Sequence, residues 1–223
     1  MLKHKNLLSV IIFAIAMAYF ESAVVVYLRA MYGIKDLVKD TNMVADAYTF
    51  IEIGREAATI IMLFLVGVIA GKTWKQKISF AILAFGIWDI LYYFWLYIFI
   101  QWPKSLFEWD ILFLIPLPWW GPVITPILIS ILLIVISYLI IVETKFKITP
   151  FDWTIYGLAV IVTLYTFMED SVRVILFNGG NLDEVRPTNF NWILFLVAYL
   201  ASVLVSIKIF YPKPKKIPVN HLQ

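Results

Sequence analysis

Two stretches of the chain carry acidic and basic side chains at helical spacing. Each stretch places two acids and one arginine three or four residues apart, and residues at that spacing share one face of a helix. The first set is Glu52, Arg55 and Glu56, and the second is Glu169, Asp170 and Arg173. Side chains of opposite charge on one face can form ion pairs, and crowded carboxylates can also hold protons or a cation.

Two further acids lie among apolar residues. Glu21 is flanked by aromatic and small side chains, and Asp89 lies near four aromatic residues, Trp88, Tyr92, Tyr93 and Trp95. The whole set has six acids and two arginines. Two arginines can neutralise two carboxylates, so the other four need protons, a bound cation, water or hydroxyl donors. The aromatic residues either pack in the core or contact lipid, or they line a cavity in which their faces engage a cation.

The residue types exclude several kinds of chemistry. The chain has no cysteine, which excludes disulfides, iron–sulfur clusters and cysteine nucleophiles. Its two histidines, His4 and His221, lie near the two ends, which argues against haem, zinc or di-iron sites between apolar helices. Carboxylates alone suit Ca²⁺, Mg²⁺ or Mn²⁺, but their spacing here identifies no particular metal site. We expect no cofactor and no nucleic-acid partner.

The elements that position these residues must be membrane helices. The chain of 223 residues is 62% hydrophobic and 15% charged, with a mean hydropathy of +0.88, whereas soluble domains are about 25% charged. Only helices are expected, because lipid cannot satisfy the open edges of a sheet. The sequence therefore predicts an all-α polytopic membrane helix bundle, a single domain over 1–223, with spans at roughly 7–28, 48–70, 78–100, 124–142, 153–177 and 192–210.

The basic residues near the ends of these spans predict the orientation. Eleven of them belong to one side if six spans are right: Lys3, Lys5, Lys72, Lys75, Lys77, Lys145, Lys147, Lys208, Lys213, Lys215 and Lys216. The other side has five, Arg29, Lys35, Lys39, Lys104 and Arg186. The lysine-rich side is expected in the cytoplasm, which predicts both termini there. We expect a multi-pass protein of the plasma membrane, or of the inner membrane in a bacterium, with a short basic tail at 211–223 that contacts anionic lipid.

Two segments leave alternatives open. The first apolar stretch follows Lys3 and Lys5 and contains Ala16, Met17 and Ala18, so it resembles a signal peptide, but it continues to Leu28 and favours a retained span. The second is rich in proline and tryptophan and precedes the fourth span, with Trp109–Pro118 expected to be irregular or re-entrant. That segment is either an interfacial connection or a wall over a cavity.

The predicted orientation brings the buried charges to a similar depth. By a rise of about 1.5 Å per residue, all lie in the outer half of the membrane or near its middle. Charges at such depth cost about 2.5–3.5 kcal/mol each and need partners inside the bundle. We therefore expect one acidic, partly arginine-paired cavity open to the extracytoplasmic side, formed by Glu21, Glu52, Arg55, Glu56, Asp89, Glu169, Asp170 and Arg173.

Such a cavity predicts a protein that binds or translocates a small cationic or proton-coupled solute. Two alternatives remain open from the sequence. The charges of an accessory or assembly subunit would pair with another membrane protein, and an intramembrane enzyme would use carboxylates as acid and base on a lipid or isoprenoid. The expected partners are the bilayer, a small cation or lipid-like ligand, and either a membrane-protein partner or a second copy of the chain.

Overall fold

The chain folds as a bundle of long helices with one short β-hairpin. The computed structural model describes residues 2–40, 47–142, 146–177 and 185–210. Within these ranges the helices are α1 (Leu2–Tyr32), α2 (Leu37–Asp40), α3 (Ala47–Ala70), α4 (Trp74–Ile100), α5 (Ile124–Val142), α6 (Pro150–Phe177) and α7 (Trp192–Phe210). The two strands are β1 (Trp109–Phe113) and β2 (Trp119–Pro122), which follow α4.

Five of these helices are long and apolar enough to cross a membrane, namely α1, α3, α4, α5 and α7. Large apolar side chains such as Ile69, Leu158 and Ile193 are exposed on the outside of the bundle, where lipid can cover them. The chain is therefore a helical, multi-pass membrane protein. The remaining long helix, α6, has 28 residues and carries four charged side chains, and it is not one of the five.

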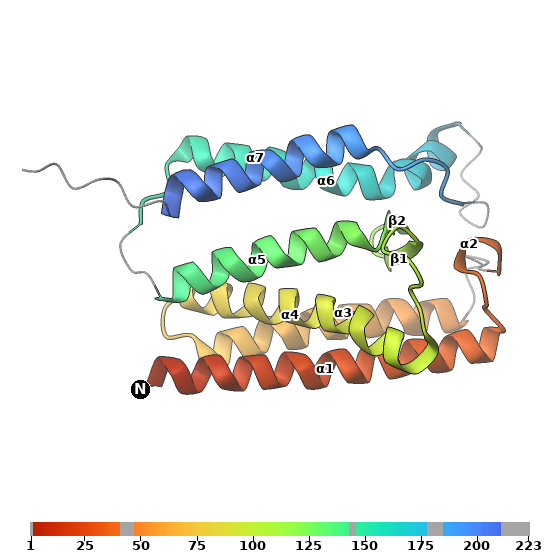
Figure 1. The fold of residues 1–223 in the computed structure, drawn as a ribbon, viewed down its shortest axis with the longest axis horizontal. Helices are drawn as coiled ribbons and strands as arrows, with labels where there is room; N and C mark the ends of the chain where they lie inside the picture. Colours follow the sequence, from red (N-terminus) through yellow and green to blue (C-terminus); the bar gives the residue numbers. More distant parts are fainter. Residues whose placement is uncertain (1, 41–46, 143–145, 178–184, 211–223) are drawn as a thin grey trace, which may run out of the picture.

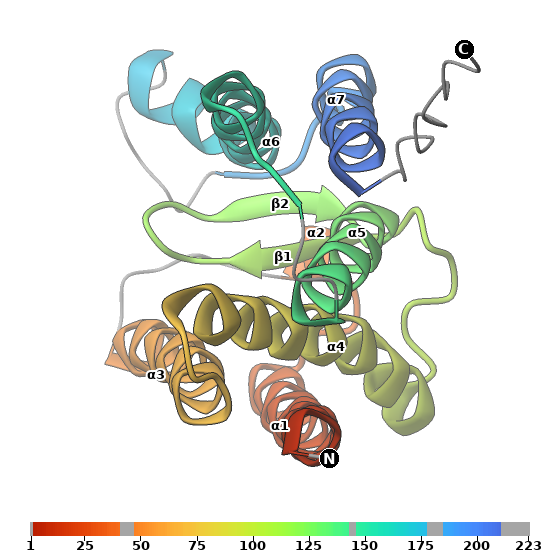
Figure 2. The ribbon, with the colours of Figure 1, turned by 90° about the vertical axis from the view of Figure 1, so that its left-hand side faces the viewer.

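The long helices run side by side along the longest axis of the molecule (Figure 1). The hairpin and α2 lie at one end, called here the hairpin end, while the start of α1 and the end of α7 lie at the other. Viewed along the axis, α1, α3 and α4 form one group and α6 and α7 form a pair (Figure 2). Helix α5 packs against α4, and β2 contacts both α5 and α6.

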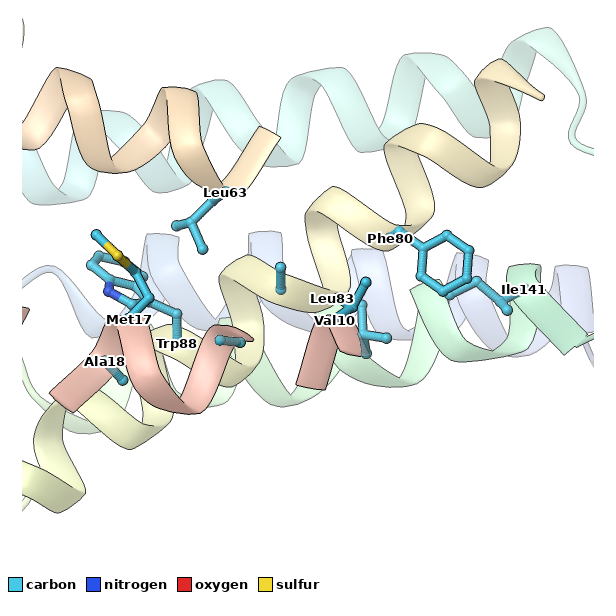
Figure 3. Packing of buried hydrophobic residues seen from close by; sticks show 10 residues of the cluster. Val10, Met17, Ala18, Leu63, Phe80, Leu83, Trp88 and Ile141 are labelled. Atoms are coloured by element: carbon cyan, nitrogen blue, oxygen red, sulfur yellow. The ribbon is translucent and has the colours of Figure 1, made fainter. Parts of the chain in front are cut away.

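The core of the first group consists of small and apolar residues. Val10 and Ala14 of α1 pack with Leu83 and Ala84 of α4, and the same cluster extends to Phe80 and Ile141 (Figure 3). A side-chain carbon at Gly67 would clash with the backbone nitrogen of Ala81. Small residues thus let α1 and α3 approach α4 closely, as is common between membrane helices.

Local capping explains where several helices begin and end. Thr73 caps the start of α4 by accepting a hydrogen bond from the backbone of Gln76, and Gln101 ends that helix in the left-handed conformation. Helix α6 begins at Pro150, where the side chains of Thr149 and Asp152 bond each other's backbone nitrogens. These caps fix helix ends that hydropathy alone leaves uncertain.

Helices α6 and α7 are joined along their length. At one end Lys208 forms an ion pair with Asp152 at 2.6 Å, and one turn further Tyr156 and Ser206 share a hydrogen bond of 2.8 Å. At the hairpin end Phe195 of α7 lies against Phe167 of α6. The two helices therefore form one unit.

The segment predicted to be irregular or re-entrant folds instead as an antiparallel hairpin. Asp110 lies opposite Gly121, and Ile111 lies opposite Trp120. The expectation that only helices would form is corrected for this segment, because its backbone groups are bonded by protein and do not need lipid. The nitrogen of Leu114 donates to Glu56, and the carbonyl of Pro118 accepts from Ser171.

Gly121 allows the hairpin to lie against α6. A side-chain carbon at this position would come within 3.0 Å of the ring of Phe167. The absence of a side chain at Gly121 therefore lets β2 lie close to α6.

Candidate functional site

The structure contains a cavity of about 480 Å³ between the two helix groups, called here the acidic cavity. Helices α1, α3, α4, α5, α6 and α7 contribute to its wall, and the hairpin covers it at the hairpin end. Five of the eight residues predicted from the sequence line it, and two unexpected charged residues join them. The charged lining is Glu21, Arg29, Glu52, Arg55, Glu56, Asp89 and Asp110.

Arg55 is the centre of one ion-pair cluster in this cavity. Its guanidinium pairs with Glu21 of α1, and its Nε donates to Oε2 of Glu52 at 2.8 Å. The hydroxyl of Thr59 donates to the other oxygen of Glu21 at 3.0 Å. The side chain of Arg55 is 18% exposed. The prediction that Arg55 pairs with carboxylates inside the bundle is therefore confirmed, and the cluster joins α1 to α3.

Glu56 connects α3 to the hairpin. Its two carboxylate oxygens accept hydrogen bonds from the backbone nitrogen of Leu114, at 3.2 and 2.9 Å. Leu114 directly follows β1, so this contact holds the turn of the hairpin over the cavity. The partner is a neutral amide, and a single amide does not neutralise a carboxylate.

Asp89 is buried in the middle of α4 and contacts α5. It accepts a hydrogen bond of 2.8 Å from the hydroxyl of Ser130, which is again a neutral partner. Trp88, Tyr92 and Tyr93 line the cavity beside it. This agrees with one of the two alternatives from the sequence, in which these aromatic residues line a cavity. Trp95 instead packs edge-on against Tyr19 of α1.

Arg29 and Asp110 form a second charged cluster that sequence reasoning missed. Arg29 lies 3.7 Å from Oδ1 of Asp110 and stacks over the ring of Trp102 at 3.9 Å. The hydroxyl of Tyr93 donates to Oδ2 of Asp110 at 2.9 Å. Burial of Asp110 in the hairpin raises the pKa of its carboxyl to about 6, although Arg29 and the bond from Tyr93 oppose the rise.

The sequence signals for this pair were present but weak. Arg29 follows the predicted first span by a single residue, so it lies at the membrane boundary and not far out in a loop. Asp110 stands beside Trp109 in a segment of apolar and aromatic residues. Both were assigned to outer connections, because nothing in the sequence indicates that β1 folds back over the end of α1.

The second predicted charge set lies outside the acidic cavity. Glu169 and Arg173 line a separate pocket of about 390 Å³ with Thr188 and Asn191. Asp170 accepts from the backbone nitrogen and the hydroxyl of Thr188, at 3.1 and 2.7 Å. These residues attach α6 to the segment before α7, so the single cavity expected for all six acids is divided.

A helical wheel explains why Glu169 lies outside the acidic cavity. Phe167 of α6 lines the acidic cavity, and Glu169 is two residues further, about 200° around a helix of 3.6 residues per turn. Arg173 pairs with Glu169 at 3.1 Å, but its side chain is 50% exposed. Its pairing agrees with the prediction, whereas its burial inside the bundle does not.

The acidic cavity has more acids than bases. Five carboxylates line it with two arginines. In the part of the chain that the structure describes, Glu56 and Asp89 take part in no ion pair. Over the same residues, no group of three acids or histidines is placed to hold a metal ion. The cavity can therefore compensate its surplus carboxylates with protons, water or a cationic ligand.

Comparison with known proteins does not place this chain in a family. No protein-family model, curated protein or solved structure matches it. The geometry of the acidic cavity is therefore the basis on which a function can be inferred.

Proposed function

We propose that this membrane protein binds a small organic cation in the acidic cavity. The observation that carries the proposal is the surplus of carboxylates, five against two arginines, around one cavity. A buried carboxylate without a positive partner is costly. A bound cation would remove that cost, and the site would bind it for the same reason.

The two acids without an ion pair are the central binding residues in this proposal. Glu56 accepts only from the amide of Leu114 and Asp89 from the hydroxyl of Ser130, among the contacts of the described residues. They approach the cavity from α3 and α4, so a cation between them would be attracted from two sides. Both acids keep their neutral hydrogen bonds when the ligand leaves.

The aromatic lining supports an organic cation over a bare metal ion. Trp88, Tyr92 and Tyr93 line the cavity from α4, and Trp119 and Phe167 line it from the hairpin and α6. Aromatic faces attract ammonium groups through their negative π-surface. Amines and quaternary ammonium compounds combine the positive charge and the apolar surface that such a lining favours.

The proposal includes six spans with both termini in the cytoplasm. Helix α6 has the length of a span, and the start of α1 and the end of α7 lie at the same end of the bundle (Figure 1). Lys72, Lys75 and Lys147 belong to that end, which supports a cytoplasmic placement. The charged part of the cavity then lies toward the extracytoplasmic side.

Choline titration of the purified protein tests the proposed function. Choline and its uncharged carbon isostere, dimethylbutanol, are added in a neutral detergent, and tryptophan fluorescence is followed because Trp88 and Trp119 line the cavity. We expect saturable binding of choline and none of the isostere. Asp89→Asn and Glu56→Gln each remove one negative charge and keep the shape, so we expect affinity to fall about tenfold or more.

Glu169→Gln is the matched control for this titration. It removes a carboxylate at the same end of the bundle, but from the second pocket, so choline affinity should not change. Equal binding of choline and the isostere, or unchanged affinity in both Asp89→Asn and Glu56→Gln, would contradict the proposal.

An intramembrane enzyme is a second candidate that one observation favours. Asp89 and Asp110 line one cavity in different surroundings: a serine hydroxyl bonds the first, while an arginine and a tyrosine contact the second. Two carboxylates in unlike surroundings can divide the roles of acid and base. Conversion of a copurified lipid by the wild type, and its loss in Asp89→Asn, would favour this candidate over simple binding.

A further inference from the structure

We propose that the ligand of the acidic cavity is a single-chain cationic amphiphile, whose chain lies along α5 and α6 and which enters from the membrane between α3 and α6. This inference rests on the proposed function and specifies the class of cation. It follows from the half of the cavity that contains no charged residue.

The part of the cavity away from the hairpin is lined by apolar side chains. Leu132, Leu133 and Ile136 contribute from α5, and Ala159, Val160 and Leu164 contribute from α6. At its far end lies Tyr156, whose hydroxyl bonds Ser206 of α7 at 2.8 Å. A small cation at the carboxylates would leave this apolar wall without a partner, whereas an alkyl chain would cover it.

The length of this part suits one hydrocarbon chain. Along α6 the lining runs from Phe167 to Tyr156, eleven residues or about 16 Å at a rise of 1.5 Å each, roughly half of the ~30 Å hydrocarbon core. If α6 crosses the membrane, the charged end lies toward one boundary and the apolar end toward the middle. A lipid in that leaflet has the same orientation.

The cavity is open on the flank between α3 and α6. Among the described residues, α3 contributes only Glu52, Arg55 and Glu56, all near its start, and none of its later residues closes the apolar part. On the opposite side of the opening, Val160 lines the cavity and is 57% exposed. Figure 2 shows α3 and α6 on the same flank, in separate helix groups. In a membrane this flank faces lipid.

The charges select the head group of the amphiphile. The carboxylates outnumber the arginines at the charged end, so an anionic phosphate or carboxylate head would be repelled. Among the described residues Glu56 and Asp89 take part in no ion pair, and an uncharged head would leave them so. A long-chain amine or quaternary ammonium compound satisfies both the charged end and the apolar end of the cavity.

A series of alkyl chains tests the inference. Choline, hexyltrimethylammonium, dodecyltrimethylammonium and uncharged dodecanol are titrated against the protein in nanodiscs of one neutral lipid. We expect affinity to rise with chain length among the ammonium compounds and dodecanol to bind much more weakly than dodecyltrimethylammonium. Each methylene moved from water into an apolar site contributes about fourfold at full burial.

Cavity-filling variants separate binding at the site from partition into lipid. Ala159→Leu fills the apolar end, so we expect affinity for dodecyltrimethylammonium to fall about tenfold, with choline unchanged. Val160→Trp, at the open flank, replaces an already exposed side chain. It should also lower the affinity for dodecyltrimethylammonium and leave the affinity for choline unchanged. The matched control is Gly157→Leu on α6, which adds a side chain where no atom lies within 4 Å and should leave both affinities unchanged.

The outcomes distinguish this inference from the proposed function. Equal affinity for choline and the long-chain compound, with no selective effect of Ala159→Leu or Val160→Trp, would overturn the amphiphile and leave cation binding intact. Dodecanol binding as tightly as dodecyltrimethylammonium would overturn the cationic head group. Failure of every ammonium compound to bind would overturn both proposals.

Discussion

Removal of Arg55 should destabilise the protein more than removal of any exposed charge. Arg55 is 18% exposed and pairs with both Glu21 and Glu52. Its loss in Arg55→Ala leaves two carboxylates in the cavity without their cation. Breaking a buried pair by removing one partner typically costs about 3–5 kcal/mol. For a domain of this size, that corresponds to a decrease in melting temperature of roughly 10 °C.

Thermal unfolding in neutral detergent measures this effect, and Arg173→Ala is the matched control. Arg173 also pairs with acids on its own helix, but its side chain is 50% exposed. An exposed pair contributes about 1 kcal/mol or less, so the control should unfold within a few degrees of the wild type. Both variants remove the same side chain and differ in burial.

A double variant identifies the cause of the destabilisation. Glu21→Gln removes the acid that pairs with Arg55 across α1 and α3. If uncompensated charge is responsible, Arg55→Ala with Glu21→Gln should be more stable than Arg55→Ala alone. Equal melting temperatures for Arg55→Ala and Arg173→Ala would refute the reasoning, because they would mean that Arg55 reaches water.

The hairpin and the helix ends provide three more tests. The pKa of Asp110 is raised from 3.8 to about 6, so the neutral carboxyl stabilises the fold well below pH 3.8, and this contribution is lost as pH rises through 6. Relative to Asp110→Asn, the wild type should therefore lose about 3 kcal/mol of unfolding free energy between pH 3 and 7. If the difference in stability between the wild type and Asp110→Asn stays constant across a pH series of melting curves, this prediction is contradicted. Gly121→Val places side-chain carbon atoms against the ring of Phe167 and should lower the unfolding free energy by roughly 1–3 kcal/mol in the same assay. An unchanged melting temperature would show that the hairpin can move to make room for the side chain. In intact cells, a cysteine at Lys104 should react with a membrane-impermeant thiol reagent and one at Lys75 should not, and the reverse pattern would overturn the proposed orientation.

The positions of the helices along the chain could be predicted because hydropathy is a local property. The predicted spans at 124–142 and 192–210 coincide with α5 and α7, and the span at 48–70 begins one residue after the start of α3. At α4 the prediction began at 78 and the helix begins at Trp74, because the cap at Thr73 adds a polar turn that hydropathy does not detect. The apolar residues that lipid contact requires therefore identify the spans in the sequence, and short-range hydrogen bonds set where each helix begins and ends.

The arrangement around the cavity could be predicted only in part. Depth along a helix follows from residue number, so Glu21, Glu52, Glu56 and Asp89 were correctly placed near one another. The direction in which a helix face points depends on its neighbours, and Glu169 therefore could not be assigned to a side of the bundle.

The hairpin was missed for a related reason. Its stability depends on contacts with distant residues, such as Leu114 with Glu56 and Pro118 with Ser171. Proline and tryptophan predicted an irregular segment, but neither residue type specifies strand pairing.

The division of the bundle into two helix groups has a mechanical consequence. The pair α6–α7 is joined internally at both ends, by Lys208 with Asp152 and by Phe195 with Phe167, and it meets the rest of the protein through β2 and α5. A rigid-body displacement of the pair would disturb fewer contacts than a rearrangement inside either helix group. The space between the groups can then change width while the secondary structure and the α1–α3–α4 core stay intact. Ligands of different width would then be accommodated by rotation of the α6–α7 pair, without repacking of side chains.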